Sequence, residues 1–281
     1  MESQAAYVSI VICGYKYEKF IDLIKSNLEN FPSSWQVVFV DNNEDDKCLK
    51  NLREKLTEIG NNIEIIYLHN PIAGVGPSRD YATSYVNNDT IIYMDVDDIL
   101  LDLSYINMVI DEHIKNNYDI TLSPIQTKLQ SKFKPNYVTN KSLKLNLLKY
   151  LSMKGQYNII LSKSLMNEIK WGYYNFSTAE FGGYFVLRCF SKGFNVGLSS
   201  KSLFIYNEAN VHSIVRKKRD NIRYNELALY YLLCFQELNS VRNLLWIKIY
   251  PIKIVYFLKV LYYGVIKTVN PIFFYYNIFN Q

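Results

Sequence analysis

Long hydrophobic runs are missing from this chain of 281 residues, and so are the loop motifs of several enzyme classes. Charged residues interrupt every stretch long enough to cross a bilayer, so we expect no transmembrane helix. The polar N-terminus and its short first apolar run also predict no signal peptide. A G-x-x-x-x-G-K-S/T loop is absent, and Gly74 with Gly76 makes only an incomplete dinucleotide fingerprint. These absences argue against kinases and nicotinamide-dependent enzymes.

Cysteine is also scarce. The four cysteines (Cys13, Cys48, Cys189 and Cys234) lack the paired spacing of zinc sites. We therefore expect reduced thiols in a cytoplasmic protein. With 49% hydrophobic residues, the chain can bury a full α/β core.

Short apolar strands alternate with helical patterns along the first hundred residues. The expected strands cover 7–13, 35–40, 63–68 and 90–94, and the expected helices cover 18–30, 47–59 and 79–86, the last capped by Ser78. This alternation predicts right-handed βαβ units and a largely parallel sheet. Further along the chain we expect strands at 119–123 and 157–161, a helix at 143–151, and an aromatic loop near the site at 170–176.

The fourth expected strand runs into the carboxylates of Asp95-Val96-Asp97-Asp98. Because side chains alternate along a strand, Asp95 and Asp97 are expected to point the same way at its carboxyl end, where open α/β sheets place their ligand crevice. Two hard oxygen ligands suit Mg²⁺ or Mn²⁺, a cation often also held by phosphate oxygens. An ordinary surface loop rich in Asp is the alternative.

Two more residues are candidates for ligand binding because of their position. Asp41 directly follows an expected buried strand, so its carboxylate needs a partner, which water or the N–H of a nucleotide base would supply. Arg79 is expected at a helix N-terminus beside a Gly-rich turn, a place that suits anions. It could instead be an ordinary helix-surface residue.

Taken together, these segments resemble a family 2 glycosyltransferase of the GT-A fold. The resemblance covers about residues 7 to 215 and rests on the order and spacing of 8–12, 14–18, Asp41, 74–80 and 95–98. It implies an α/β protein with a Rossmann-like mixed sheet flanked by helices. Its catalytic domain would span 1–215, with a nucleotide-sugar-binding half at 1–100 and an acceptor-binding half at 101–215, followed by a C-terminal helical region at 216–281.

The resemblance also implies roles for single residues. The implied nucleotide-sugar-binding residues are Tyr15, Glu18, Asp41, Arg79, Asp95 and Val96. Among them Tyr15 and Glu18 would border the nucleoside, Asp41 would accept from the base, Arg79 would face the base or diphosphate, and Asp95 would lie near the ribose. Asp97 would take the metal, Mn²⁺ or Mg²⁺. Lys16 and Asp80 stand where the family commonly has Asn, and Lys16 is expected to alter nucleotide preference.

The stretch from Ser177 to Arg188 resembles the Glu-Asp segment that opens a helix in this family. Phe181 replaces the expected Asp, which leaves Glu180 as the local carboxylate able to deprotonate an acceptor hydroxyl. A carboxylate merely favoured by the helix dipole is the alternative. His212 resembles the position from which some members reach the metal, although the usual Arg-x-His phrase is absent, and a local hydrogen-bonding role is the alternative.

The last 41 residues contain no acidic residue. Five cations there equal the whole formal net charge of +5: Arg242, Lys248, Lys253, Lys259 and Lys267. On a helix they fall within an arc of about 140°, among many aromatic residues. Such a helix can lie in a membrane interface, drawn to anionic lipid. A helix packed on the domain or on a partner subunit is the alternative.

We therefore expect a metal-dependent hexosyl- or N-acetylhexosaminyl-transferase that moves a sugar from a nucleotide-diphosphate donor, a UDP-sugar, to a saccharide hydroxyl with inversion. The acceptor is expected to be a lipid-linked precursor of a bacterial cell-surface polysaccharide such as capsule. The protein would be peripheral on the inner face of the cell membrane, with no nucleic-acid partner, and a homo-oligomer is compatible with the sequence. A non-catalytic nucleotide-sugar or saccharide binding subunit and a nucleotidyltransferase remain alternatives.

Overall fold

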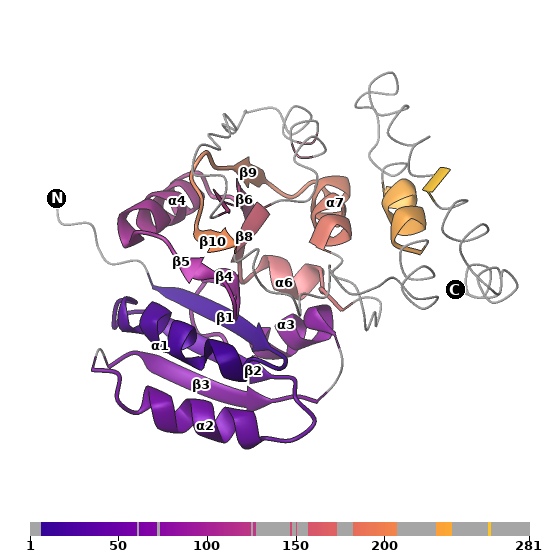
Figure 1. Cartoon of the computed structure of the whole chain (residues 1–281). Coiled ribbons are helices and arrows are strands. Elements are labelled where there is room, and N and C mark those ends of the chain that lie inside the picture. Colours follow the sequence, from indigo (N-terminus) through magenta and orange to yellow (C-terminus); the bar gives the residue numbers. More distant parts are fainter. Residues whose placement is uncertain are drawn as a thin grey trace, which may run out of the picture.

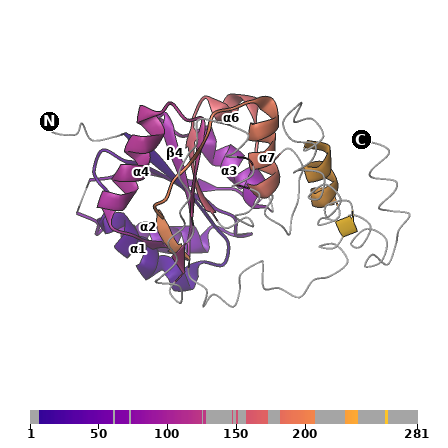
Figure 2. The same cartoon turned by 90° about the horizontal axis from the view of Figure 1, so that it is seen from above.

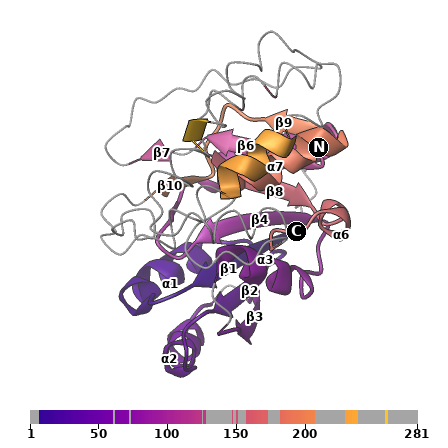
Figure 3. The same cartoon turned by 90° about the vertical axis from the view of Figure 1, so that its right-hand side faces the viewer.

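The structure, a computed structural model, describes residues 7–60, 62–71, 74–124, 126–127, 147, 150, 157–172, 182–206, 229–237 and 258–259. Within these residues lies a seven-stranded sheet of order β3-β2-β1-β4-β8-β6-β9, which Figure 3 shows from bottom to top. Its strands are β1 (Val8–Gly14), β2 (Gln36–Asp41), β3 (Glu64–His69), β4 (Thr90–Asp95), β6 (Ile120–Pro124), β8 (Tyr157–Ser162) and β9 (Val196–Leu198).

The first half of the sheet is parallel and the second half is mixed. β3, β2, β1 and β4 pair in parallel, whereas β8 runs antiparallel to both β4 and β6. A smaller sheet of order β5-β10-β7 joins β5 (Ile99–Leu100), β10 (Phe204–Tyr206) and β7 (Gln126–Thr127). The expected α/β fold with a mixed sheet is therefore confirmed, and so are the expected strands.

Helices cover both faces of the large sheet (Figures 1 and 2). One face carries α1 (Ile21–Glu29), α2 (Lys47–Leu56) and α4 (Leu103–Lys115), and the short η1 (Glu18–Phe20) precedes α1. The opposite face carries α3 (Val75–Thr83), α6 (Leu165–Glu168) and α7 (Gly182–Lys192), with helical residues 229–237 also packed there. The strands read as nearly continuous apolar runs because both faces are covered.

Alternation along β1 divides its side chains between two cores. Ile10 and Ile12 pack among residues of α1, α2 and α4, and Val11 packs on the opposite side among residues of α3 and α7. All three are 1% exposed or less. Full burial of such a side chain contributes about 1.5 to 3 kcal/mol, so β1 is a main source of stability at the centre of the sheet.

The expected start of α3 is wrong. The helix begins at Val75, so Ser78 lies in its first turn and does not cap it. The Ser78 hydroxyl donates to the Gly74 carbonyl at 2.8 Å and accepts from Asn42 Nδ2 at 2.6 Å. Pro77 is tolerated because the first-turn N–H groups have no helical partner. Of the helix expected at 143–151, only Leu147 and Tyr150 lie within the described residues, and both are helical.

The basic C-terminal region falls largely outside the described residues. Of its five cations only Lys259 is described, and its Nζ lies 4.5 Å from the ring centroid of Tyr231 and 3.2 Å from the Tyr231 hydroxyl. Residues 229–237 themselves pack on α7, with Leu233 and Cys234 buried. Where the structure describes helices, none combines the length and apolar character that a bilayer span needs.

A buried histidine joins α4 to the sheet. His113 is 2% exposed, with Nδ1 at 2.9 Å from Thr121 Oγ1 and Nε2 at 3.3 Å from Ser162 Oγ. Ser162 Oγ already donates its proton to the Tyr118 carbonyl, so it accepts from Nε2–H, and Nδ1 accepts from Thr121. Burial lowers the pKa of His113 to about 4 because the imidazolium would be desolvated.

This histidine should make folding stability depend on pH. In the unfolded chain its pKa is about 6.5, so between pH 6.5 and 4 the unfolded state binds a proton that the folded state excludes. We expect the contribution of His113 to the free energy of unfolding to fall by on the order of 3 kcal/mol as the pH drops through that window. Urea denaturation of the wild type and of His113→Gln at pH 7, 5.5 and 4 measures this fall. The difference in the free energy of unfolding between the two proteins isolates His113, because all other titrating groups are the same in both. If the free energy of unfolding depends on pH in the same way in both proteins, His113 is not the source of the effect.

Candidate active site

Strand pairing brings the ends of β1, β2 and β4 to one edge of the sheet. Gly14 at the end of β1 is opposite Asp41 of β2, and Cys13 is opposite Asp95 of β4. The chain also crosses from one side of β1 to the other at this point, since β2 and β3 lie on one side and β4 on the other. Such a switch point is where open α/β sheets bind ligands, so Asp41 and Asp95 flank the predicted crevice.

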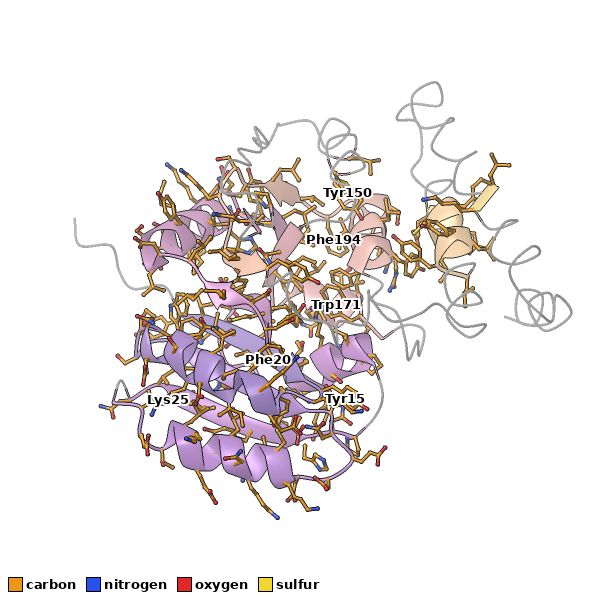
Figure 4. All side chains as sticks on the ribbon, in the orientation of Figure 1. Tyr15, Phe20, Lys25, Tyr150, Trp171 and Phe194 are labelled. Carbon is orange, nitrogen blue, oxygen red and sulfur yellow. The ribbon has the colours of Figure 1, made fainter. Side chains whose placement is uncertain are left out.

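The loop after β1 presents two of the residues expected at the nucleoside. Tyr15, labelled in Figure 4, is 49% exposed, and Glu18 is exposed in η1. Lys16 between them has a φ of 52°, a left-handed conformation that Asn tolerates better than Lys. Its backbone N–H donates to Asn43 Oδ1 at 2.9 Å. The geometry explains why Asn suits this position and shows that Lys16 carries backbone strain.

The carboxylate of Asp41 is fully buried and only half satisfied. Oδ1 accepts from the backbone N–H of Asn43 at 3.0 Å and from Asn43 Nδ2 at 2.8 Å. Oδ2 makes no hydrogen bond of ordinary length among the described residues, and neither does the Tyr17 hydroxyl. That hydroxyl lies close enough to interact with the Asp41 carboxylate and helps to stabilise its charged form. Burial raises the pKa of Asp41, while the bonds from Asn43 oppose that rise. A buried acceptor without a partner is costly, so this oxygen is suited to a ligand N–H.

The turn after β4 differs from the geometry expected for Asp95 and Asp97. The strand ends at Asp95, so strand alternation does not set the direction of Asp97. The Asp95 side chain is 46% exposed, whereas Asp97 and Asp98 are buried. Asp98 closes the turn: its N–H donates to the Asp95 carbonyl at 3.1 Å, and its Oδ2 accepts from the Asp95 N–H at 3.2 Å. Val96 is partly buried against the core beside α1.

A buried amide from α1 holds this turn in place. Asn27 is 4% exposed; its Nδ2 donates to the Asp98 carbonyl at 2.9 Å, and its Oδ1 accepts from the Leu100 N–H at 3.0 Å. Both backbone groups thus find partners where the chain leaves β4. Sequence reasoning missed Asn27 because its partners are more than seventy residues away, and its one signal is a polar residue on the apolar face of a helix.

The carboxylates of this turn suit a hard divalent cation in their donor chemistry. Asp95 and Asp97 supply oxygen ligands, which Mn²⁺ and Mg²⁺ prefer. No group of three or more His, Cys, Asp or Glu side chains with metal-binding geometry occurs among the described residues. In donor chemistry alone, the oxygens of Asp95 and Asp97 fit a hard cation of the kind that also takes ligands from phosphate oxygens and water.

Arg79 is neither a surface residue nor at the helix N-terminus. It is the fifth residue of α3, and its side chain is 8% exposed. Its guanidinium carbon lies 5.1 Å from the ring centroid of Tyr93 and 4.7 Å from that of Trp171. One guanidinium nitrogen lies 3.4 Å from Asp95 Oδ1. These contacts direct the buried guanidinium of Arg79 toward the end of β4. The expectation that Arg79 faces the diphosphate therefore depends on this packing and not on the helix dipole.

The expected catalytic residue and one expected metal ligand fall outside the part of the chain that the structure describes. Glu180 and His212 lie outside the described residues, as does Phe181. From the expected aromatic loop, Lys170, Trp171 and Gly172 are described, and Trp171 lies between α3 and α7 (Figure 4). Trp171 thereby brings this loop into contact with Arg79.

The family model for glycosyl transferase family 2 matches residues 9–179. This match covers more than half of the chain, and the chain belongs to that family. Membership makes glycosyl transfer its class of reaction. Among curated protein sequences, none matches the chain.

Solved structures show the same fold at low sequence identity. S. aureus TarS 1–349 in complex with UDP-GlcNAc is similar with a TM-score of 0.64 and 16% identity, over 92% of this chain and 81% of that one. A Pyrobaculum calidifontis mannosyltransferase with GDP-Man and Mn²⁺ gives 0.60 and 10%, over 94% and 71%. Glucosyl-3-phosphoglycerate synthase from Mycobacterium tuberculosis, with Mn²⁺, UDP-Glc and phosphoglyceric acid, gives 0.52 and 12%, over 82% and 80%. The expected GT-A fold is thus confirmed.

Replacing Asn27 should destabilise the protein through the turn that follows β4. Asn27→Leu keeps the side-chain size but leaves the Asp98 carbonyl and the Leu100 N–H without partners, which should lower the free energy of unfolding by about 2 kcal/mol or more. Urea denaturation measures the change. The matched control is Asn51→Leu on the exposed side of α2, which should change stability by less than about 0.5 kcal/mol. Equal effects of the two substitutions would show that Asn27 does not hold the turn.

Proposed function

We propose that the chain transfers a sugar from a nucleotide-diphosphate donor to a saccharide hydroxyl by direct displacement, with inversion at the anomeric carbon. One observation carries the proposal. Asp41, with a buried oxygen that lacks a partner, and Asp95, which opens the carboxylate turn, lie on opposite sides of the end of β1. A nucleoside between them would give Asp41 the missing N–H and bring its diphosphate to the carboxylates.

Base recognition is assigned to Asp41, Tyr15 and Glu18. A uracil imide N–H would donate to Asp41 Oδ2, while the exposed Tyr15 and Glu18 border the nucleoside. Two of the similar structures contain a UDP-sugar and one contains GDP-Man, which supports uridine as the first candidate and guanosine as the second. Strain at Lys16 persists beside this site, which supports a role for that side chain in nucleotide preference. The sugar is a hexose or an N-acetylhexosamine.

The diphosphate is assigned to the end of β4. Asp97 would hold Mn²⁺ or Mg²⁺, with Asp95 near the ribose beside Val96 and with His212 as a further candidate ligand. A bound cation there supplies electrostatic stabilisation of the negative charge that the departing diphosphate develops. Arg79 lies 3.4 Å from Asp95 and would share in neutralising that charge. Two of the similar structures contain Mn²⁺, which supports a divalent cation.

The acceptor half is assigned the proton transfer. Glu180 would take the proton from the acceptor hydroxyl as that oxygen attacks the anomeric carbon. Phe181, where the family has Asp, leaves Glu180 without a carboxylate neighbour and supports a second candidate, a binding subunit that has lost catalysis. The two candidates differ in sugar-dependent nucleotide release.

The setting is proposed to be bacterial cell-surface polysaccharide synthesis, with a lipid-linked saccharide as acceptor. The cytoplasmic protein would lie on the inner face of the cell membrane through the aromatic region after Ser240, whose charged residues are all cations. Among these cations, Lys259 packs on Tyr231, and the helical residues 229–237 that include Tyr231 pack in turn on α7 of the domain.

The reaction is tested by incubating the protein with UDP- and GDP-sugars and saccharide acceptors in Mn²⁺ and following release of the nucleotide. Release should depend on the sugar and stop in EDTA. Asp97→Asn should keep the fold and lower kcat/KM by the equivalent of about 2 to 4 kcal/mol of transition-state stabilisation. Asp111→Asn, an exposed change on α4, is the matched control. Binding without any release would support the non-catalytic subunit, and full activity of Asp97→Asn would remove Asp97 from the metal site.

Membrane contact is tested by sedimentation with vesicles of anionic or neutral lipid. Removal of residues 241–281 should abolish sedimentation with anionic vesicles. Changing Arg242, Lys248, Lys253 and Lys267 to Gln should weaken it strongly, because each cation near such a surface contributes about 1 kcal/mol at low salt. Lys259 is kept in the second variant so that its contact with Tyr231 survives. If the Gln variant sediments like the wild type, or loses a defined oligomer without any change in vesicle binding, the region is a packing or assembly element.

A further inference from the structure

A partly buried carboxylate on α3, that of Asp80, fastens a loop of the acceptor half to the donor half. Asp80 Oδ1 accepts from the Trp171 N–H at 2.8 Å, and its Oδ2 accepts from the Gly172 N–H at 2.5 Å. Each oxygen therefore holds one of two consecutive backbone N–H groups, and hydrogen bonds to an ionised acceptor are the stronger kind. Burial raises the pKa of Asp80, and the two N–H groups oppose that rise by stabilising the charged form.

Two glycines let the helix and the loop approach backbone to backbone. A Cβ on Gly76 would lie 3.1 Å from the Trp171 carbonyl oxygen. A Cβ on Gly172 would lie 2.9 Å from Asp80 Oδ2 and 3.2 Å from Pro77 Cα. Neither position can accept a larger residue without moving the loop. The short distance between α3 and the loop therefore depends on a glycine in each of them.

The fastened loop places the indole of Trp171. Its ring stacks on Phe185 of α7 with centroids 4.0 Å apart and an interplanar angle of 7°, and it meets Tyr93 edge-on at 5.3 Å. The Arg79 guanidinium carbon lies 4.7 Å from the same indole. Trp171 is thus one wall of the space that holds the Arg79 side chain, and Arg79 reaches the Asp95 carboxylate.

We propose that Asp80 is a positioning residue for donor binding: it fixes Trp171, and Trp171 holds Arg79 in the orientation that meets the diphosphate. The inference rests on one part of the proposed function, the assignment of Arg79 to the donor diphosphate. An Asn at position 80 would offer a single acceptor to two N–H donors and would hold the loop less firmly. The Asp found here, where the family commonly has Asn, makes both bonds.

The link from Asp80 to Trp171 is measured first in the free protein. With 5-fluorotryptophan incorporated, the ¹⁹F resonance of Trp171 is assigned by its loss in Trp171→Phe. Asp80→Asn and Asp80→Ala should shift or broaden that resonance, and Asp111→Asn should leave it in place. Gly172→Ala provides a second route to the same displacement if Asp80→Ala does not fold. An unmoved Trp171 resonance in all of these variants overturns the proposal.

The link to donor binding is measured by calorimetry with UDP and GDP in Mn²⁺, well below each variant's unfolding temperature. Asp80→Ala should raise the Kd of the nucleotide that the wild type binds by about tenfold or more, and Asp80→Asn by a smaller factor. In an Arg79→Gln background, Asp80→Asn should have no further effect, because its influence passes through Arg79.

The two measurements separate the possible failures. A moved Trp171 resonance with unchanged Kd, or equal effects of Asp80→Asn with and without Arg79, overturns the positioning role and leaves only a structural one. If the wild type binds neither UDP nor GDP, the donor site of the proposed function fails, and the donor role of Asp80 fails with it even though the resonance moves.

Discussion

Parallel pairing of β1 with β2 and β4 is the constraint on which the rest of the site depends. The register sets Gly14 beside Asp41 and Cys13 beside Asp95, so the polar ends of neighbouring strands meet at one edge. A shift by one residue would turn Ile10 and Ile12 toward the wrong core and separate these carboxylates at the same time. Burial of β1 on both faces therefore fixes the site as well as the fold.

Buried and partly buried polar groups then decide the details of that edge. Asn27 holds the turn after β4, Asp41 has one oxygen without a hydrogen bond, and Asp80 ties α3 to the loop of Trp171. Each of these groups gives up hydration, a cost that only specific partners offset. Asn27 and Asp80 receive theirs from backbone groups, which makes them anchors. Asp41 does not receive a full set, which makes it the best-supported candidate for ligand binding at the site.

Much of this architecture could be read from the sequence. The strands, the order of βαβ units and the family resemblance follow from apolar runs and local motifs, because those patterns reflect burial that each segment needs wherever it packs. The errors occurred where local rules compete. Ser78 is a good capping residue, yet α3 begins before it, since its hydroxyl bonds to Gly74 and Asn42. Strand alternation predicts that Asp97 points the same way as Asp95, but Asp98 closes a turn directly after Asp95.

The sequence by itself determined the fold class, the family and the identity of the carboxylates at the strand ends, because these depend on short-range patterns. Only the tertiary structure decided what surrounds them. The sequence predicts Arg79 near a helix end, whereas in the structure its guanidinium lies against Tyr93 and Trp171, which are 14 and 92 positions further along the chain. Such contacts arise from packing of distant segments, and no local pattern in the chain encodes which aromatic ring will meet which cation.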